Sequence, residues 1–223
     1  MNPAESPHPA AGDAREASEG FGGEGLLAGV LVGGASRRMG RPKHLLPHPA
    51  GGTFLEYAVR LAQGVAGETV ILGACAGAPA ALAGLARLED AVAGAGPLAG
   101  LCSLLAEARQ RWALLLACDM PRLEASTLRA LLDALRCFPD PAAIEAVAFV
   151  EQEGPRLRPH PCCALYRGTI HARALEVLRT GSGRMGELLE RVSLLALAPS
   201  RAQIAQLANV NTPAEYAWIA SKR

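Results

Sequence analysis

The sequence has no long apolar run, no marked excess of either charge and few aromatic residues. A formal net charge of +1 is not the basic excess that a nucleic-acid-binding surface needs. No apolar run reaches the roughly 18 residues that span a bilayer, and residues 1–24 contain no apolar core for a signal peptide. Aromatic residues make up 4% and hydrophobic residues 50% of the chain, which is typical of a compact protein with an aliphatic core. We therefore expect no nucleic-acid partner and no membrane partner.

The usual signatures of redox, zinc and nucleophilic chemistry are also missing. The six cysteines form no C-x-x-C pair, and the vicinal pair Cys162–Cys163 is poorly suited to bridge to itself. Reduced thiols packed as small hydrophobic groups are the simplest interpretation, which predicts a cytoplasmic protein. The chain also has no nucleophilic-serine elbow and no credible catalytic triad, so a chemistry without a protein nucleophile is favoured.

Two familiar phosphate-binding loops can be excluded. A Walker A loop needs Gly-Lys followed by Ser or Thr, whereas Lys43 lies between Pro42 and His44. The dinucleotide fingerprint needs the spacing G-x-G-x-x-G, which the glycines near the N-terminus do not have. A GTPase switch and a classical dinucleotide-binding enzyme are therefore poor candidates.

What the sequence does have is a glycine turn followed by fixed positive charge. The apolar run 26–32 reads as a buried strand, and it breaks at Gly33–Gly34, where backbone without a Cβ can approach a ligand. Cationic side chains follow, among them Arg38 and Lys43. Exposed N–H groups and Arg or Lys donors are what a triphosphate needs. A plain strand-exit loop with solvated charges is the alternative from these residues alone.

Strands and helices alternate along the rest of the chain. We expect strands near 26–32, 69–72, 87–90, 112–117, 146–150, 162–166 and 192–198, and helices near 53–63, 79–85, 97–109, 124–135, 169–179, 184–190 and from 214. This order predicts an α/β fold with a mostly parallel open sheet and helices on both faces. Residues 1–24 read as a disordered tail, and residues 25–223 read as one domain.

Two acidic residues follow predicted strands. Asp119 comes directly after a buried strand, and Asp90 ends another. Ligands in open α/β sheets bind beyond the carboxyl ends of the strands, and Mg²⁺ takes one or two carboxylates together with phosphate oxygens. We therefore expect Asp119 to bind Mg²⁺, with Asp90 as a possible second contact. The alternatives are a helix cap or turn for Asp119 and an ordinary loop acid for Asp90.

Near the C-terminus, Asn209 and Asn211 alternate in the segment Asn-Val-Asn-Thr-Pro. In an extended segment both amides point to one side, where they could bind a polar ligand such as a pterin or a phosphate. The alternative is an Asx turn with Thr212 capping the terminal helix. His160 lies in a proline-rich segment, where a single histidine is usually structural.

Taken together, these residues resemble the molybdenum cofactor guanylyltransferases, the MobA-like nucleotidyltransferases. The similarity covers nearly all of the chain beyond the tail. The pieces occur in the family's order: Gly33-Gly34-x-x-x-Arg38-Met39-Gly40 with Lys43, Glu89-Asp90, Gly96-Pro97-Leu98-Ala99-Gly100, Cys118-Asp119-Met120-Pro121, His160-Pro161 and Asn209-Val210-Asn211-Thr212-Pro213. The first motif is shared by many nucleotidyltransferases, and its combination with the last is more specific.

The resemblance implies a Rossmann-like fold of the nucleotide-diphospho-sugar transferase type and transfer of GMP from GTP to molybdopterin, or Mo-molybdopterin, with release of pyrophosphate. It implies contacts with other proteins of molybdenum cofactor biosynthesis and with apo-molybdoenzymes. The roles that it implies are nucleotide binding by Leu31, Val32, Gly33, Gly34, Lys43, Asp90 and Asp119, catalysis by Arg38, Lys43 and Asp119, Mg²⁺ binding by Asp119, and molybdopterin binding by Asn209 and Asn211.

The chain departs from the family pattern at two positions. Val32 stands where the family usually has Ala, and Gly73 stands where related sequences often carry a nucleotide-binding Asn. The change at Gly73 bears on base selectivity. Three alternatives follow: a molybdopterin cytidylyltransferase, a sugar-phosphate nucleotidylyltransferase of the same fold, and a nucleotide or cofactor carrier without turnover.

Overall fold

The computed structural model describes residues 25–32, 42–180 and 183–221. Its centre is a seven-stranded sheet in the order β3-β2-β1-β4-β6-β5-β7. The strands are β1 (Leu26–Leu31), β2 (Glu68–Leu72), β3 (Arg87–Leu88), β4 (Trp112–Ala117), β5 (Ala146–Glu153), β6 (Arg156–Arg167) and β7 (Leu194–Leu197). All neighbouring strands are parallel except that β6 runs antiparallel to β4 and β5. The predicted mostly parallel α/β sheet is therefore confirmed.

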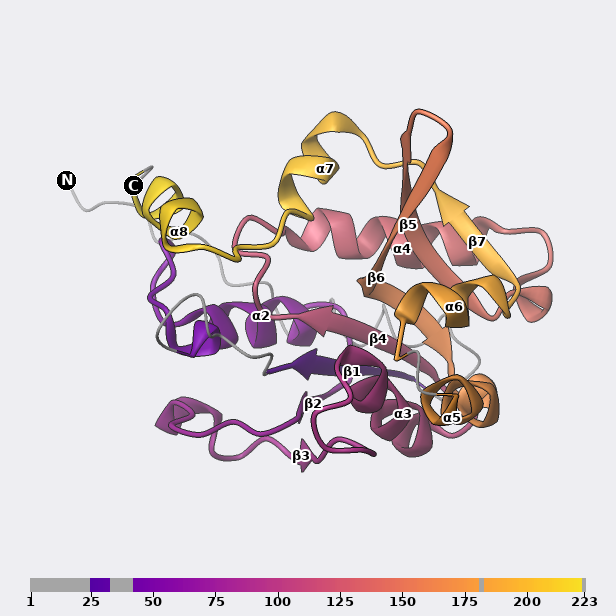
Figure 1. The fold of residues 1–223 in the computed structure, drawn as a ribbon, viewed down its shortest axis with the longest axis horizontal. Helices are drawn as coiled ribbons and strands as arrows, with labels where there is room; N and C mark the ends of the chain where they lie inside the picture. The colour runs from indigo at the N-terminus through magenta and orange to yellow at the C-terminus, as the bar shows by residue number, and fades with distance from the viewer. Residues whose placement is uncertain (1–24, 33–41, 181–182, 222–223) are drawn as a thin grey trace.

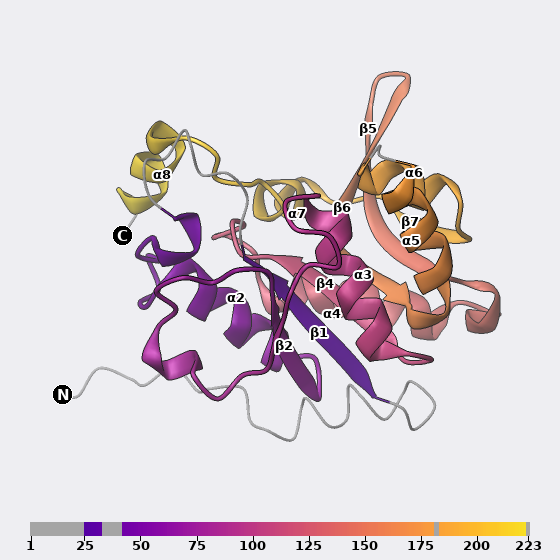
Figure 2. The ribbon, with the colours of Figure 1, turned by 60° about the horizontal axis from the view of Figure 1, so that its bottom comes forward.

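Helices cover both faces of this sheet (Figures 1 and 2). They are α2 (Phe54–Gln63), α3 (Pro97–Ala108), α4 (Ala125–Cys137), α5 (His171–Arg179), α6 (Met185–Glu190), α7 (Arg201–Gln206) and α8 (Pro213–Ala220). One apolar core packs α2 and α4 against the sheet, and a second packs α3, α5 and α6 against the other face. Because both faces are covered, the central strands β1 and β4 are apolar throughout, as the sequence suggested.

Local chemistry explains where the first helix begins. The Thr53 hydroxyl accepts a hydrogen bond from the Glu56 N–H, and the Glu56 carboxylate accepts one from the Thr53 N–H in return. This reciprocal capping satisfies two N–H groups that the first turn leaves open. The apolar stripe of α2, which includes Leu55, Ala58 and Val59, is buried against the sheet. The expected helix near 53–63 is therefore present with almost the expected bounds.

Three local expectations were wrong. Residues 79–85 form only a short 3₁₀ turn, Ala80–Leu82, because a single side chain there, Leu82, is buried. The short helix α7 was not expected; a capping box between Ser200 and Gln203 supports it, and none of its residues is buried.

The third error concerns β5 and β6, whose apolar inner halves alone were predicted. The two strands continue as one long antiparallel hairpin to the turn at Gly154. Its outer half, with Glu151 paired to Arg158 and Glu153 paired to Arg156, is too polar to read as strand. The hairpin projects beyond the sheet in both views (Figures 1 and 2).

Candidate active site

The candidate site lies at the carboxyl edge of the parallel strands. Leu31 ends β1 in the middle of this edge and Val32 follows it, while Asp119 follows β4, the direct neighbour of β1. The next residues of the predicted phosphate loop, including Gly33, Gly34 and Arg38, lie outside the described residues. The geometry below therefore concerns the groups that surround the exit of β1.

Three predicted residues from distant parts of the chain meet here. The Lys43 ammonium donates hydrogen bonds to Asp119 Oδ2 at 3.0 Å and to Asn211 Oδ1 at 2.7 Å. The side chains of Lys43 and Asp119 are 21% and 17% exposed, so the ion pair is shielded from water but still reachable by a ligand. We call Lys43, Asp119 and Asn211 the catalytic cluster.

Backbone contacts hold the catalytic cluster together. The Val210 N–H donates to the Asp119 carbonyl at 2.9 Å, which joins the C-terminal segment to the exit of β4. The Glu215 carboxylate accepts from the N–H groups of Asn211 at 2.6 Å and Thr212 at 2.9 Å. Those backbone hydrogen bonds lower the pKa of Glu215. The start of α8 therefore fixes the asparagine that contacts Lys43.

Asp119 has one carboxylate oxygen to spare. Oδ2 accepts from Lys43, whereas Oδ1 is buried and has no hydrogen-bond partner among the described residues. A buried carboxylate oxygen without a partner is unfavourable unless a cation or donor meets it. No group of three or more acidic, histidine or cysteine side chains suited to a metal occurs in the described part of the chain. One carboxylate oxygen plus substrate phosphates nevertheless fits Mg²⁺, which is seldom enclosed by protein ligands alone.

Asp90 lies on the other side of the β1 exit, next to two glycines. A Cβ added to Gly73 or to Gly100 would come within 3.4 Å of Asp90 Oδ1. The Gly100 position would also bring a Cβ to 2.6 Å from the Leu31 side chain. Ser103 of α3 donates to the neighbouring Glu89 carbonyl at 2.6 Å and holds the loop. Burial raises the pKa of Asp90.

Gly73 is required by the backbone. Its φ is +90°, and a Cβ there would lie 2.7 Å from the Val32 carbonyl oxygen. An L-residue in this conformation would be strained and would push on the end of β1. Glycine, and not the asparagine of related sequences, therefore suits position 73, because the end of β1 and the backbone at this position lie so close together.

The cysteines near the site are inert. All six are free, and burial, followed by the negative charge of Asp119, raises the pKa values of Cys118 and Cys162 to about 12. Such thiols stay protonated and unreactive at neutral pH. His160, which the sequence left as structural, has its Nε2 2.5 Å from Glu151 Oε1, and both side chains are largely buried.

Several supporting residues were not found from the sequence. His48 donates from Nε2 to the Pro121 carbonyl at 2.7 Å and accepts at Nδ1 from the Ala50 N–H at 3.0 Å. Its ring stacks on Tyr57 with centroids 3.7 Å apart. This ties the segment after Lys43 to the loop after Asp119. Glu215 could have been found, because Thr212-Pro-Ala-Glu215 has the spacing of a capping box.

The two asparagines differ in their surroundings. Asn211 contacts Lys43, whereas Asn209 lines a separate pocket together with Arg122 and Trp218. The two amides therefore lie in different surroundings, one at the ion pair and one in the pocket, and their predicted role in binding molybdopterin stays a prediction.

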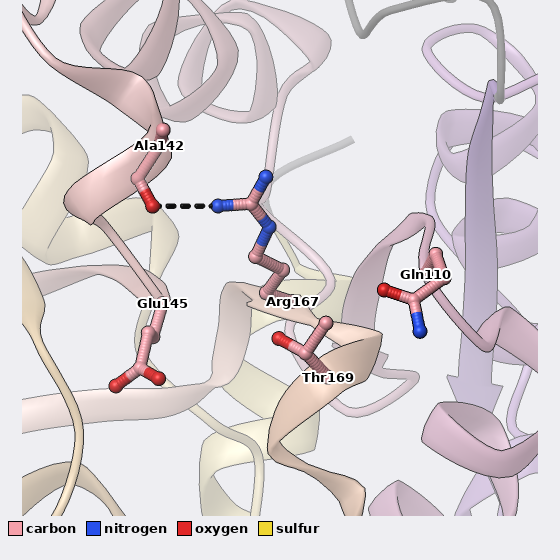
Figure 3. Close-up of a pocket in the computed structure, with 5 residues that line it drawn as sticks. All are labelled: Gln110, Ala142, Glu145, Arg167 and Thr169. Carbon is pink, nitrogen blue, oxygen red and sulfur yellow. Dashed lines mark hydrogen bonds between the residues drawn. The ribbon is translucent and has the colours of Figure 1, made fainter.

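Another pocket, of about 360 Å³, lies between the amino ends of β4 and β5 and is lined by Gln110, Ala142, Glu145, Arg167 and Thr169 (Figure 3). Its charged groups already have partners. Arg167 donates to the Ala142 carbonyl at 2.8 Å, and Arg173 bonds the Glu145 carboxylate and lowers its pKa. Because ligands of open α/β sheets bind at the opposite edge, this hollow is not the candidate active site.

The seven-stranded, mostly parallel open sheet, with a lysine–aspartate pair at its carboxyl edge, defines the chain as an open α/β fold. Comparison with solved structures agrees. The molybdopterin-guanine dinucleotide biosynthesis protein A from Archaeoglobus fulgidus superposes with a TM-score of 0.68 at 19% identity, over 87% of this chain and 97% of that one. At this identity the similarity concerns the fold, which is of the nucleotide-diphospho-sugar transferase type.

Sequence comparison identifies the family. The family model of the MobA-like NTP transferase domain matches residues 28–197. A probable molybdenum cofactor guanylyltransferase from Nostoc sp. is 32% identical over 87% of this chain and 90% of its own. One from Mycobacterium avium is 33% identical over 88% and 96%. The chain belongs to the MobA-like NTP transferase family and is a nucleotidyltransferase. Within the described residues, no helix is long and apolar enough to cross a bilayer.

Proposed function

We propose that this protein transfers GMP from GTP to the terminal phosphate of molybdopterin, or Mo-molybdopterin, with release of pyrophosphate. The observation that carries the proposal is the catalytic cluster, in which Lys43 joins Asp119 to Asn211 at the exit of β1. Curated relatives over most of the chain are named as probable molybdenum cofactor guanylyltransferases, which supports the choice of substrates.

The nucleotide would bind over β1 and β2. The backbone of Leu31 and Val32, continued by Gly33 and Gly34, would lie against the guanosine, with Asp90 accepting from its donors. Gly73 and Gly100 lie beside Asp90, where a Cβ on either would come within 3.4 Å of its Oδ1. Arg38 and Lys43 would bind the phosphates, since Arg and Lys donors pair well with phosphate oxygens.

Asp119 would hold Mg²⁺ through Oδ1, the buried oxygen without a partner among the described residues. When bound, the ion would neutralise charge on the triphosphate and help the pyrophosphate to leave. No other strongly acidic site is needed, because substrate phosphates and water complete the coordination of this metal.

The protein's own contribution is positioning and charge compensation. A phosphate oxygen of the acceptor would attack the α-phosphorus of GTP in line with the departing pyrophosphate. Lys43, held by Asp119 and Asn211, would offset negative charge that develops on the phosphates, and Arg38 would do the same from the loop. Asn211 accepts a hydrogen bond from the lysine and would hold it between the donor and the acceptor. No protein nucleophile is required.

The test is pyrophosphate release with GTP, Mg²⁺ and molybdopterin, with CTP and UTP as control donors. We expect release that depends on both GTP and the pterin. Release of pyrophosphate with CTP or UTP would instead indicate one of the alternative nucleotidyltransferase activities. Tight GTP binding without pyrophosphate release would indicate a carrier without turnover. Lys43→Met should lower turnover by about 10²–10³-fold, as for the loss of one transition-state donor.

The remaining assignments follow from the same proposal. GTP and the pterin are cytoplasmic metabolites, so we place the protein in the cytoplasm. Its product would be a cofactor of molybdoenzymes, which would make apo-molybdoenzymes and other proteins of cofactor biosynthesis its partners. A pull-down with an apo-molybdoenzyme, with and without GTP and molybdopterin, would test this part.

A further inference from the structure

Glu215, in the first turn of α8, makes one contact more than a helix cap requires. The Thr212 hydroxyl accepts from the Glu215 N–H at 3.2 Å, and Glu215 Oε2 accepts from the Thr212 N–H at 2.9 Å, which completes a capping box. The same oxygen also accepts from the N–H of Asn211 at 2.6 Å, one residue before the cap. One carboxylate oxygen therefore holds two successive N–H groups, and the shorter bond goes to a residue of the catalytic cluster.

The other two capping boxes in the described part of the chain are simpler. In α2 the Glu56 carboxylate accepts from the N–H and the hydroxyl of Thr53. In α7 the Gln203 side chain accepts from the Ser200 N–H. These bonds join the third residue of the helix to the cap residue itself. Of the three boxes, the one at α8 is therefore the one that connects a helix terminus to the proposed active site.

Asn211 passes this restraint on to Lys43. Its Oδ1 accepts from the Lys43 ammonium at 2.7 Å, and the same ammonium donates to Asp119 Oδ2 at 3.0 Å. A lysine carries its charge on a flexible four-carbon stem, so the position of that charge is defined by the acceptors that converge on it. The Asn211 side chain can serve as such an acceptor only while its own backbone is fixed, and the bond to Glu215 fixes it.

Helix α8 is itself anchored to the segment that follows Lys43. A small apolar cluster packs α8 against Leu46, and the Tyr216 hydroxyl donates to the Pro47 carbonyl at 3.1 Å. The helix lies beside the beginning of α2, at one end of the molecule (Figures 1 and 2). Glu215 therefore belongs to an element whose position is set relative to the backbone that carries the lysine.

A negative charge suits this place in the helix. The amino end of a helix carries a partial positive charge, which a carboxylate in the first turn offsets. Without it, the amino end of α8 would disfavour the nearby Lys43 ammonium. Backbone hydrogen bonds from Asn211 and Thr212, and to a smaller extent the charge of Lys43, lower the pKa of Glu215. Glu215 is therefore a carboxylate at neutral pH.

We propose that Glu215 is a positioning residue of the reaction: it fixes Asn211, and Asn211 holds the Lys43 ammonium beside Asp119. We call the contacts from Glu215 through Asn211 to Lys43 the lysine relay. The inference rests on the proposed function and adds a residue to it. All contacts of the relay lie within the chain, so the lysine is positioned before a substrate binds. Displacing a reacting group by about 1 Å can cost about 10²-fold in rate, so the effect of losing the anchor is expected in kcat.

Kinetics of matched variants test the relay. Glu215→Ala should lower the kcat for GTP-dependent pyrophosphate release by about 10–10²-fold. Glu215→Gln should recover most of this loss, because one amide oxygen can accept from both N–H groups. The control Glu56→Ala removes the corresponding side chain from the α2 cap. It should lower Tm by roughly 2–4 °C, as Glu215→Ala should, without lowering kcat.

Two kinetic results would overturn the proposal. Equal losses of kcat in Glu215→Ala and Glu56→Ala would show that Glu215 is only a structural cap. A Glu215→Gln variant as slow as Glu215→Ala would assign the effect to charge and not to the hydrogen-bonded relay.

A double-mutant cycle tests whether Glu215 acts through Asn211. If it does, adding Glu215→Ala to an Asn211→Ala protein should change kcat by less than about twofold, because the side chain that it positions is already absent. Effects that multiply would show that Glu215 acts independently of Asn211, for example by direct contact with a substrate, and would overturn the proposal.

Amine labelling follows Lys43 without any turnover. The chain has two lysines, Lys43 and Lys222, so mass spectrometry after brief treatment with acetic anhydride gives the labelling of Lys43 relative to Lys222. We expect Glu215→Ala and Asn211→Ala each to raise this ratio by about 2–10-fold, the scale of one lost hydrogen bond, and Glu56→Ala to leave it unchanged. An unchanged ratio in Glu215→Ala would overturn the relay. If the ratio rises but the wild-type protein releases no pyrophosphate with GTP and molybdopterin, the proposed reaction is refuted while the relay stands.

Discussion

Gly73 lies against the Val32 carbonyl and beside Asp90, and replacing it by alanine tests how strongly the fold and the proposed nucleotide site depend on this close approach. The residue has a φ of +90°, and the new Cβ would lie 2.7 Å from the Val32 carbonyl oxygen. A left-handed conformation costs a non-glycine residue about 1–2 kcal/mol. Relieving the contact must move backbone at the end of β1, where the Val32 N–H donates to the Leu72 carbonyl at 2.9 Å. We expect a total loss of about 2–3 kcal/mol in the free energy of unfolding.

For a chain of this size that loss corresponds to a fall in Tm of roughly 4–12 °C. Thermal unfolding followed by circular dichroism measures it. The matched control is Gly84→Ala, because Gly84 has no atom within 4 Å of a new Cβ and no left-handed φ. Replacing a glycine at such a compatible site is neutral or stabilising, by about 0.4–1 kcal/mol.

The same perturbation should reach the nucleotide. The new Cβ would displace the Val32 carbonyl, and the backbone of Val32 belongs to the proposed nucleotide site. We therefore expect Gly73→Ala also to weaken GTP binding, which calorimetry measures. Gly73→Asn introduces the amide that related sequences often carry, and we expect it to be destabilised as well. The reasoning is refuted if Gly73→Ala unfolds at the wild-type temperature, or if Gly73→Asn binds GTP more tightly without any loss of stability.

Three further outcomes are expected. Asp119→Asn should lower kcat by about 10²–10³-fold in a Mg²⁺ titration, with little change in Tm. The control Asp133→Asn, which replaces an exposed carboxylate on α4, should have no effect. Equal activities of the two variants would show that Asp119 has no role in catalysis. Burial lowers the pKa of His48, so the unfolded chain takes up its proton first as pH falls. Stability should therefore decline below about pH 6.5, and His48→Gln should flatten this decline in urea unfolding curves; an unaltered slope would exclude His48 as its source. Thr53→Ala removes the α2 cap and should cost about 1 kcal/mol of unfolding free energy, while Ser126→Ala on α4 should cost little; equal losses would contradict the capping argument.

Much of the fold could be predicted because its strands are buried on both faces. Runs such as Trp112–Ala117 are apolar throughout, and they alternate with stretches of helical periodicity, so the sheet and its parallel character follow from the pattern. The outer half of the β5–β6 hairpin could not be found in this way. Its strands pair polar residues, such as Glu151 with Arg158. Strands were predicted from runs of apolar residues, so paired strands whose side chains are polar could not be recognised.

The site was predictable to the extent that it depends on strand exits. Asp90 and Asp119 follow strands, and the exits of parallel strands share one edge, so a common crevice could be expected. The partnership of Lys43 with Asn211 could not, because 168 positions separate the two residues and nothing local indicates the contact. Trp218 is similar: nothing in the sequence of the C-terminal helix indicates that the Arg122 guanidinium lies over its ring.

In the proposed reaction, the phosphates of the donor and the acceptor would meet at the Lys43 ammonium. Lys43 follows the predicted phosphate loop, Asp119 follows β4 and Asn211 precedes α8, so three separate parts of the chain determine where its charge lies. Asp119 uses one carboxylate oxygen to hold this lysine and leaves the other without a partner among the described residues. A carboxylate arranged in this way can orient a cationic side chain and bind a metal ion at the same time. The lysine would then be in position before either substrate arrives, and electrostatic stabilisation would need little rearrangement when the charge develops.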